Sequence, residues 1–133
     1  MLTNWHHLNL LAILAGGFLY IIYGTIYYSI FLSDRKKSRP EGLFEQMKGP
    51  SKYIFSIVIA FISSFLVSFL IQASDSHTGL EGALTGFIIG FLISMVYFKN
   101  CLFGLMSKKA FWIAIGDHLV VFTLLGFLQG FIL

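Results

Sequence analysis

The chain has 133 residues, of which 57% are hydrophobic and only 11% are charged, and its formal net charge is +3. A soluble globular domain has about a quarter charged residues, so this composition excludes an ordinary water-facing protein. The length fits a single domain, and too little sequence lies outside the apolar runs to form a separate soluble catalytic domain.

Four long apolar runs follow one another along the chain. Each run is near or above the ~20 residues that a helix needs to cross the ~30 Å hydrocarbon core of a bilayer. The predicted spans are residues 8–31, 53–73, 79–98 and 111–133. The sequence therefore predicts an all-α membrane protein, a bundle of four transmembrane helices that forms one membrane domain over residues 1–133.

The first span is flanked by residues typical of membrane interfaces. Trp5 precedes it, and five aromatic residues approach its other end: Tyr20, Tyr23, Tyr27, Tyr28 and Phe31. Tryptophan and tyrosine favour the headgroup level of a bilayer. Met1–Asn9 contains no Lys or Arg, and the apolar run is longer than the apolar region of a signal peptide. We therefore expect the first span to remain in the mature protein.

A short amphipathic helix is predicted between the first and second spans. Pro40 is a favourable first helical residue, and Gly49 and Pro50 are stop signals. Between them, apolar residues fall on one side of a helix: Leu43, Phe44 and Met47. We expect this segment to lie on the inner leaflet of the membrane.

The basic residues are confined to two of the connections. The first contains Arg35, Lys36, Lys37, Arg39, Lys48 and Lys52, and the second contains Lys99, Lys108 and Lys109. Cytoplasmic loops of membrane proteins carry the excess of Lys and Arg. This pattern predicts cytoplasmic loops at 32–52 and 99–110 and both termini extracytoplasmic, in a multi-pass protein of a bacterial cell membrane. Attraction to the anionic lipid bilayer explains the positive charge, so no nucleic acid is expected as a partner.

The remaining polar connection is acidic and contains histidine. It runs from Ser74 to Glu81, and with the residues before the first span it supplies His6, His7, Asp75, His77 and Glu81. Imidazole and carboxylate groups bind transition metals, but these residues come from two segments and lack a metal-ligand spacing. We expect a polar cap at the membrane surface, with no metal and no cofactor. Cys101 is alone, which rules out an internal disulfide.

Small residues recur every four positions in the spans and so share a helix face. The third span has Gly82, Gly86, Gly90 and Ser94; the second has Ser56, Ala60, Ser64, Ser68 and Gln72; the fourth has Gly126 and Gly130. Such faces let helix backbones approach closely in lipid. We expect ordinary helix packing, with the second and third spans meeting along these faces. The alternatives are a polar path and self-association as a homo-oligomer.

Asp117 and His118 form the candidate intramembrane polar site. At ~1.5 Å per residue, Asp117 lies roughly 9 Å into the fourth span, counted from Phe111. One hypothesis is that Asp117 carries protons or a cation with His118 as a relay. The alternative is that Asp117 bonds to a Tyr hydroxyl, a Ser or a Lys and fixes the register of the bundle. Adjacent residues on a helix point ~100° apart, so the pair cannot face one ligand symmetrically.

No enzymatic signature is present: the sequence lacks a phosphate-binding loop, a dinucleotide fingerprint, a nucleophile elbow and a paired-His zinc motif. We expect no enzyme and no catalytic residues. Permeation of an ion or small solute, of unknown substrate, is the activity that the buried charge favours. The alternative is a non-transporting membrane scaffold or accessory subunit that binds lipids or a partner protein.

Four short motifs resemble a family of small bacterial membrane proteins. They are Tyr27-Tyr28-Ser29-Ile30-Phe31, Gly82-Ala83 with Gly86, Asn100 with Leu102-Phe103, and Ile115-Gly116-Asp117. In this order and spacing the chain resembles the family catalogued as domain of unknown function 1761. The resemblance implies a four-helix membrane fold. It implies no established activity and no catalytic residues.

Overall fold

The computed structural model describes residues 10–38, 50–75 and 78–132, and the side chains of these except 31–38. Within these ranges the chain forms α-helices and no strand. The helices are α1 (Leu10–Ser38), α2 (Ser51–Ala73), α3 (Gly79–Leu102) and α4 (Lys108–Ile132). Each contains a stretch that is long and apolar enough to cross a membrane. The predicted fold class is confirmed.

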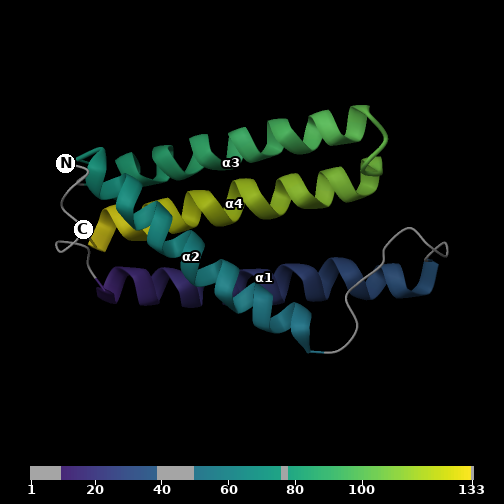
Figure 1. Ribbon diagram of the computed structural model, residues 1–133, viewed down its shortest axis with the longest axis horizontal. Helices are drawn as coiled ribbons and strands as arrows, with labels where there is room; N and C mark the ends of the chain where they lie inside the picture. Colours follow the sequence, from purple (N-terminus) through teal and green to yellow (C-terminus); the bar gives the residue numbers. More distant parts are fainter. Residues whose placement is uncertain (1–9, 39–49, 76–77, 133) are drawn as a thin grey trace.

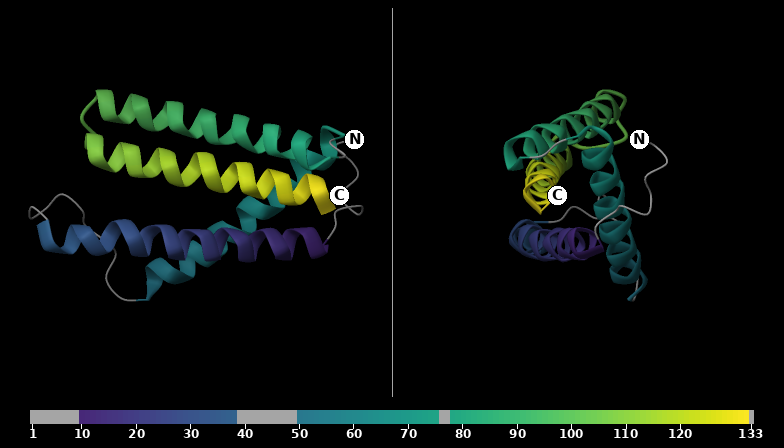
Figure 2. Two further views of the ribbon diagram at one scale, coloured as in Figure 1. Left: turned by 180° about the vertical axis from the view of Figure 1, so that it is seen from behind. Right: turned by 90° about the vertical axis from the view of Figure 1, so that its left-hand side faces the viewer.

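The helices α3 and α4 lie side by side and antiparallel, and α1 lies along the opposite side of α4 (Figures 1 and 2). The helix α2 crosses α1 and α4 obliquely, so α4 contacts all three other helices. The beginning of α1 and the end of α4 lie at the same end of the bundle (Figure 1). Any candidate site on α4 is therefore central to the molecule.

Two helices end further along the chain than the predicted spans, and α2 and α4 begin two and three residues earlier than predicted. The helix α1 continues to Ser38, seven residues beyond the predicted boundary at residue 31, and α3 continues to Leu102 rather than residue 98. No Gly or Pro interrupts either extension, so the backbone hydrogen bonds of the helix continue past the apolar residues. The amphipathic helix predicted between Pro40 and Gly49 lies outside the described residues.

The contact between α3 and α4 is a seam of backbone against backbone. A side chain added at Gly86 would overlap the backbone oxygen of Phe122, and one added at Gly82 would overlap that of Gly126. Along this seam lie Gly82, Gly86, Gly90 and Ser94 of α3, and Gly126 and Gly130 of α4; all six are buried. Because lipid gives helices no hydrophobic reason to associate, such close approach supplies much of the attraction between them.

The expected pairing of the second and third spans is wrong. The small-residue face of α3 contacts α4, and α2 has few contacts with α3 because it crosses the bundle obliquely (Figure 1). Ser56 is exposed, and its hydroxyl donates to the carbonyl oxygen of Lys52 in its own helix at 2.6 Å. The other small residues of that face, Ala60, Ser64 and Ser68, are buried.

A buried polar cluster joins α1, α2 and α4 instead. Ser64 donates through Oγ to the carbonyl oxygen of Ile13 at 2.7 Å. Gln129 donates through Nε2 to the carbonyl oxygen of Ala12 at 2.9 Å and to Ser64 Oγ at 3.2 Å. Gly16 leaves room for both side chains, since a Cβ there would overlap them. The serine face of α2 therefore supplies hydrogen bonds between helices as well as close packing.

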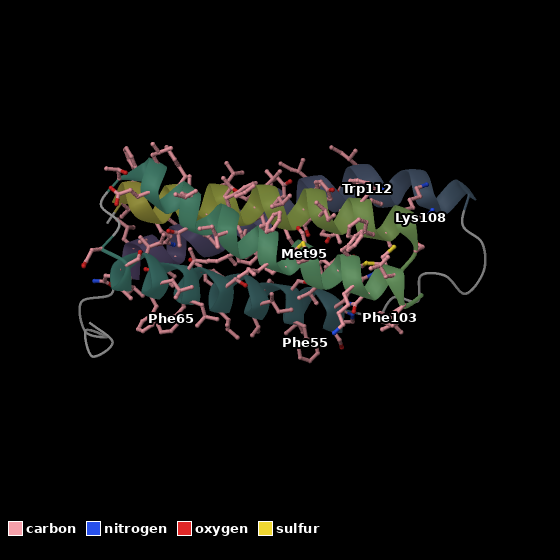
Figure 3. All side chains as sticks on the ribbon, turned by 90° about the horizontal axis from the view of Figure 1, so that it is seen from above. Phe55, Phe65, Met95, Phe103, Lys108 and Trp112 are labelled. Carbon is pink, nitrogen blue, oxygen red and sulfur yellow. The ribbon has the colours of Figure 1, made fainter. Side chains whose placement is uncertain are left out.

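The outer surfaces of the bundle are apolar. Residues 53–59 of α2 are all exposed, and Figure 3 shows Phe55 projecting away from the other helices. The interior is small by comparison: its apolar core consists of Val67, Ile71, Val121, Phe122 and Leu125. In water such a surface would be very unfavourable, whereas lipid tails cover it without cost.

Candidate functional site

Asp117 is buried in α4, with 6% of its surface exposed. Its carboxylate accepts a hydrogen bond at Oδ2 from the hydroxyl of Tyr28 on α1, at 2.5 Å. A carboxylate in an apolar interior is costly unless donors surround it, and a hydrogen bond to an ionised group is among the stronger ones. Tyr28 therefore holds the buried charge in position across the contact between α1 and α4.

Two further tyrosines of α1 bind the backbone of α4 beside Asp117. Tyr27 donates to the carbonyl oxygen of Ile113 at 2.6 Å, and Tyr23 donates to that of Gly116 at 3.3 Å. The rings of Tyr23 and Tyr27 are stacked, with centroids 5.6 Å apart. A carbonyl oxygen has two lone pairs, so α4 can keep its own helical bonds while accepting these. The tyrosines thus fix the register of α1 against α4.

Gly116 makes this arrangement sterically possible. A Cβ at this position would overlap the hydroxyl oxygen of Tyr27. Any other residue directly before Asp117 would displace the Tyr27 ring and weaken its hydrogen bond to Ile113. The local sequence Gly116-Asp117 therefore combines the charged group with the space that its neighbours need.

His118 lies next to the carboxylate but is bound to its own helix. Its Nδ1 is 2.8 Å from the carbonyl oxygen of Ala114 and 3.8 Å from Asp117 Oδ2. A carbonyl oxygen can only accept, so Nδ1 carries the hydrogen of the shorter contact, and in the neutral ring Nε2 keeps the basic lone pair. The ring of Tyr97 on α3 packs against the imidazole with centroids 5.2 Å apart.

The arrangement combines a carboxylate, an imidazole and phenol hydroxyls at one depth of the bundle. The side chains of His118 and Asp117 are 16% and 8% exposed. Carboxylate and imidazole side chains are the groups that most often exchange protons inside membrane proteins. The site therefore contains the chemical groups that proton transfer requires.

The structure brings the two predicted site residues close together, although they point in different directions from α4. The sequence is compatible with three partner types for Asp117, and the tyrosine hydroxyl is the one observed. Tyr28 itself is not singled out by the sequence, because tyrosine is common near a membrane interface whether or not it binds another helix.

Only some residues of the expected polar cap lie within the described part of the chain. His6, His7 and His77 lie outside the described residues. Of the others, Glu81 lies in the first turn of α3 and binds its N-cap residue, Thr78: the Glu81 backbone N–H donates to Thr78 Oγ1 at 3.1 Å, and the Glu81 carboxylate accepts from the same hydroxyl at 3.2 Å. In residues 10–38, 50–75 and 78–132, no group of His, Cys, Asp and Glu side chains could hold a metal ion.

Replacing Tyr28 by Phe should destabilise the bundle by about 1–3 kcal/mol, because the buried carboxylate then loses its donor. Tyr27→Phe is the matched control. It removes a hydroxyl from the next residue, but the Ile113 carbonyl oxygen that it releases is shared with α4, so the loss should be about 0.5–1 kcal/mol. Unfolding in mixed detergent micelles, followed by circular dichroism, measures both. Equal losses would show that Tyr28 is no more than a packing residue.

Four apolar helices around a buried acid define a small polytopic α-helical membrane protein. The chain belongs to the family described as protein of unknown function (DUF1761), whose model matches residues 11–130. No curated protein and no solved structure matches the chain. The family assignment agrees with the resemblance inferred from the sequence motifs and supplies no activity.

Proposed function

We propose that this protein conducts protons across a membrane, with Asp117 and His118 as the proton-binding pair. The observation that carries the proposal is the burial of the Asp117 carboxylate inside a span, beside an imidazole and a phenol hydroxyl. Ionisable groups at such depth are costly, and in membrane proteins they mark ion and proton pathways.

The contacts suggest how a proton would move through the pair. His118 takes up a proton at Nε2 and becomes a cation beside the Asp117 carboxylate. Rotation of the ring away from Ala114 then lets the Nδ1 proton pass to Asp117 Oδ2, which starts 3.8 Å away. The products are a neutral carboxylic acid and a neutral imidazole protonated at Nε2. Tyr28 keeps the carboxylate in place during the transfer.

The packing of the helices favours a proton over a larger solute. The backbones of α3 and α4 are in contact along their glycine seam, which leaves no room for a molecule between them. Between α2 and α4, two fully buried polar atoms have no hydrogen-bond partner among the described residues, namely Ser68 Oγ and Gln129 Oε1. Such atoms are suitable partners for buried water, which is small enough to fit where a solute is not.

Proteoliposomes loaded with a pH-sensitive dye test this function. A potassium diffusion potential should drive proton entry in vesicles with the wild-type protein and not in protein-free vesicles. His118→Phe should lower the rate. Thr123→Val is the matched control on α4, because the Thr123 hydroxyl bonds only to the Leu119 carbonyl oxygen of its own helix, at 2.6 Å. If protons enter vesicles with the wild-type protein no faster than they enter protein-free vesicles, the proposal is overturned.

The second candidate is a membrane scaffold or accessory subunit, alone or as a homo-oligomer. It is favoured by the hydrogen bond between Tyr28 and Asp117, which stabilises the acid without any ligand, and by the broad apolar surface of α2. On this reading the tyrosines and the buried acid only set the register of α1 against α4. The scaffold function would be supported if vesicles with the wild-type protein are impermeable to protons and the Asp117→Asn variant has a lower free energy of unfolding.

We propose the orientation that the basic connections predict, with both termini outside a bacterial cell membrane. The single native cysteine, Cys101, is partly exposed near the end of α3 and reports on one side directly. A membrane-impermeant maleimide should label it only after the cells are permeabilised. In the variant Cys101→Ser with Asp75→Cys, the reagent should label intact cells. Labelling of native Cys101 in intact cells would reverse the orientation.

A further inference from the structure

The turn between α3 and α4 is short and well ordered. The backbone N–H of Phe103 donates to the Lys99 carbonyl oxygen at 3.2 Å, and that of Leu105 donates to the Asn100 carbonyl oxygen at 2.9 Å. Gly104 has φ +80°, in the left-handed region that glycine adopts without strain. We call residues 99–112, which include this turn and the adjoining helix ends, the basic tip.

The basic tip gathers positive charge at one depth of the bundle. The rings of Phe98 and Phe111 pack with centroids 5.6 Å apart, which sets the antiparallel register of α3 and α4. In this register Lys99, Lys108 and Lys109 lie within about one helical turn of each other along the bundle axis. All three are exposed, and residues 99–112 contain no Asp or Glu. Between described residues, no ion pair includes any of these lysines.

Exposed apolar side chains surround these lysines. Leu102, Phe103 and Leu105 are 68%, 76% and 80% exposed, and Trp112 is 68% exposed. Figure 3 shows Lys108 and Trp112 on one side of the bundle and Phe103 on the other. Such exposure is unfavourable in water, whereas tryptophan and lysine together suit the boundary between headgroups and acyl chains. The tip thus offers cations and apolar groups at the same level.

We infer that the basic tip is a binding site for an anionic phospholipid. The ammonium groups of Lys99, Lys108 and Lys109 contact the phosphate and the anionic headgroup, and Trp112, on the same side of the bundle as Lys108, contacts the upper acyl chains. Charge complementarity selects this occupant over a zwitterionic lipid, because residues 99–112 carry three cations and no carboxylate of their own. The inference goes beyond proton conduction and does not depend on it.

The fluorescence of Trp112 provides the test. The chain has two tryptophans, so the variant Trp5→Phe leaves Trp112 as the single fluorophore, one turn from Lys108. The protein is reconstituted in mixtures of phosphatidylglycerol and phosphatidylcholine, with bromine on the acyl chains of one lipid or the other. The quenching of Trp112 fluorescence by each brominated lipid gives the association constant of phosphatidylglycerol at the basic tip relative to that of phosphatidylcholine. We expect a preference for the anionic lipid of about fivefold, the effect of one well-placed lysine, and a decrease at high salt.

Variants decide whether the lysines cause the preference. The triple variant with Lys99→Gln, Lys108→Gln and Lys109→Gln should reduce the ratio of the two association constants to about one. The matched control Lys52→Gln, at the beginning of α2, should keep the wild-type ratio. The single variants should give partial losses, which keeps the inference testable if the triple variant cannot be reconstituted. A wild-type ratio of one, or a ratio that the lysine variants do not change, would overturn the inference.

Discussion

Replacing Asp117 by Asn should abolish proton flux in proteoliposomes while leaving the four-helix bundle intact. Asparagine has nearly the same shape, and its side-chain oxygen can still accept the hydrogen bond from Tyr28. It cannot bind or release a proton, so the transfer from His118 has no acceptor. The expected rate is that of protein-free vesicles.

The measurement compares wild type, Asp117→Asn and the control Thr123→Val at equal protein content per vesicle. Circular dichroism and thermal unfolding in detergent establish that each variant is folded. Unchanged flux in Asp117→Asn, with a lower unfolding temperature, would contradict the conduction role. It would leave Asp117 as a residue that fixes the register of α1 and α4 through Tyr28.

Replacing Gly86 by Leu should cost about 3 kcal/mol in the free energy of unfolding, at the upper end of the range for overpacked positions. The added side chain would overlap the backbone oxygen of Phe122. Backbone of a helix cannot move aside as a flexible side chain can, so α3 and α4 must separate. This pair has the most extensive contact in the bundle, and its separation removes the support of α4 on that side.

Gly24→Leu is the matched control, because a Cβ built at that position has no described atom within 4 Å beyond its chain neighbours and the backbone of its own helix. Its effect should stay within about 0.5 kcal/mol, as for an ordinary surface substitution. Unfolding of both variants in mixed micelles, followed by circular dichroism, gives the difference. If Gly86→Leu is as stable as Gly24→Leu, the glycine seam does not hold the two helices together.

The small-residue pattern shows how far the sequence could predict the packing. Four-residue spacing correctly places Gly82, Gly86 and Gly90 on one face of α3, but it carries no information about which helix that face meets. The second span has a similar spacing, and it was expected to be the partner. The reciprocal glycines of α4, Gly126 and Gly130, lie against the backbone of α3, whereas Ser64 of the serine face of α2 bonds to α1 and α4.

The candidate site was predictable in part for a similar reason. Asp117 and His118 are recognisable because ionisable residues are rare and costly inside a span. Tyr28 is not recognisable in the same way, because a tyrosine near a membrane interface needs no special explanation. Its role depends on a contact with a residue 89 positions away, and only the docking of α1 against α4 creates that contact.

The sequence by itself determined the class of protein and the number of spans. Hydrophobicity over about 20 residues, and the scarcity of charges within such a stretch, are local properties of the chain. Only the tertiary structure decided that α4 is central, that its glycine face meets α3, and that Tyr28 binds Asp117. In lipid the hydrophobic effect does not choose between helix pairs, so pairing depends on shape and on hydrogen bonds between residues far apart in the chain.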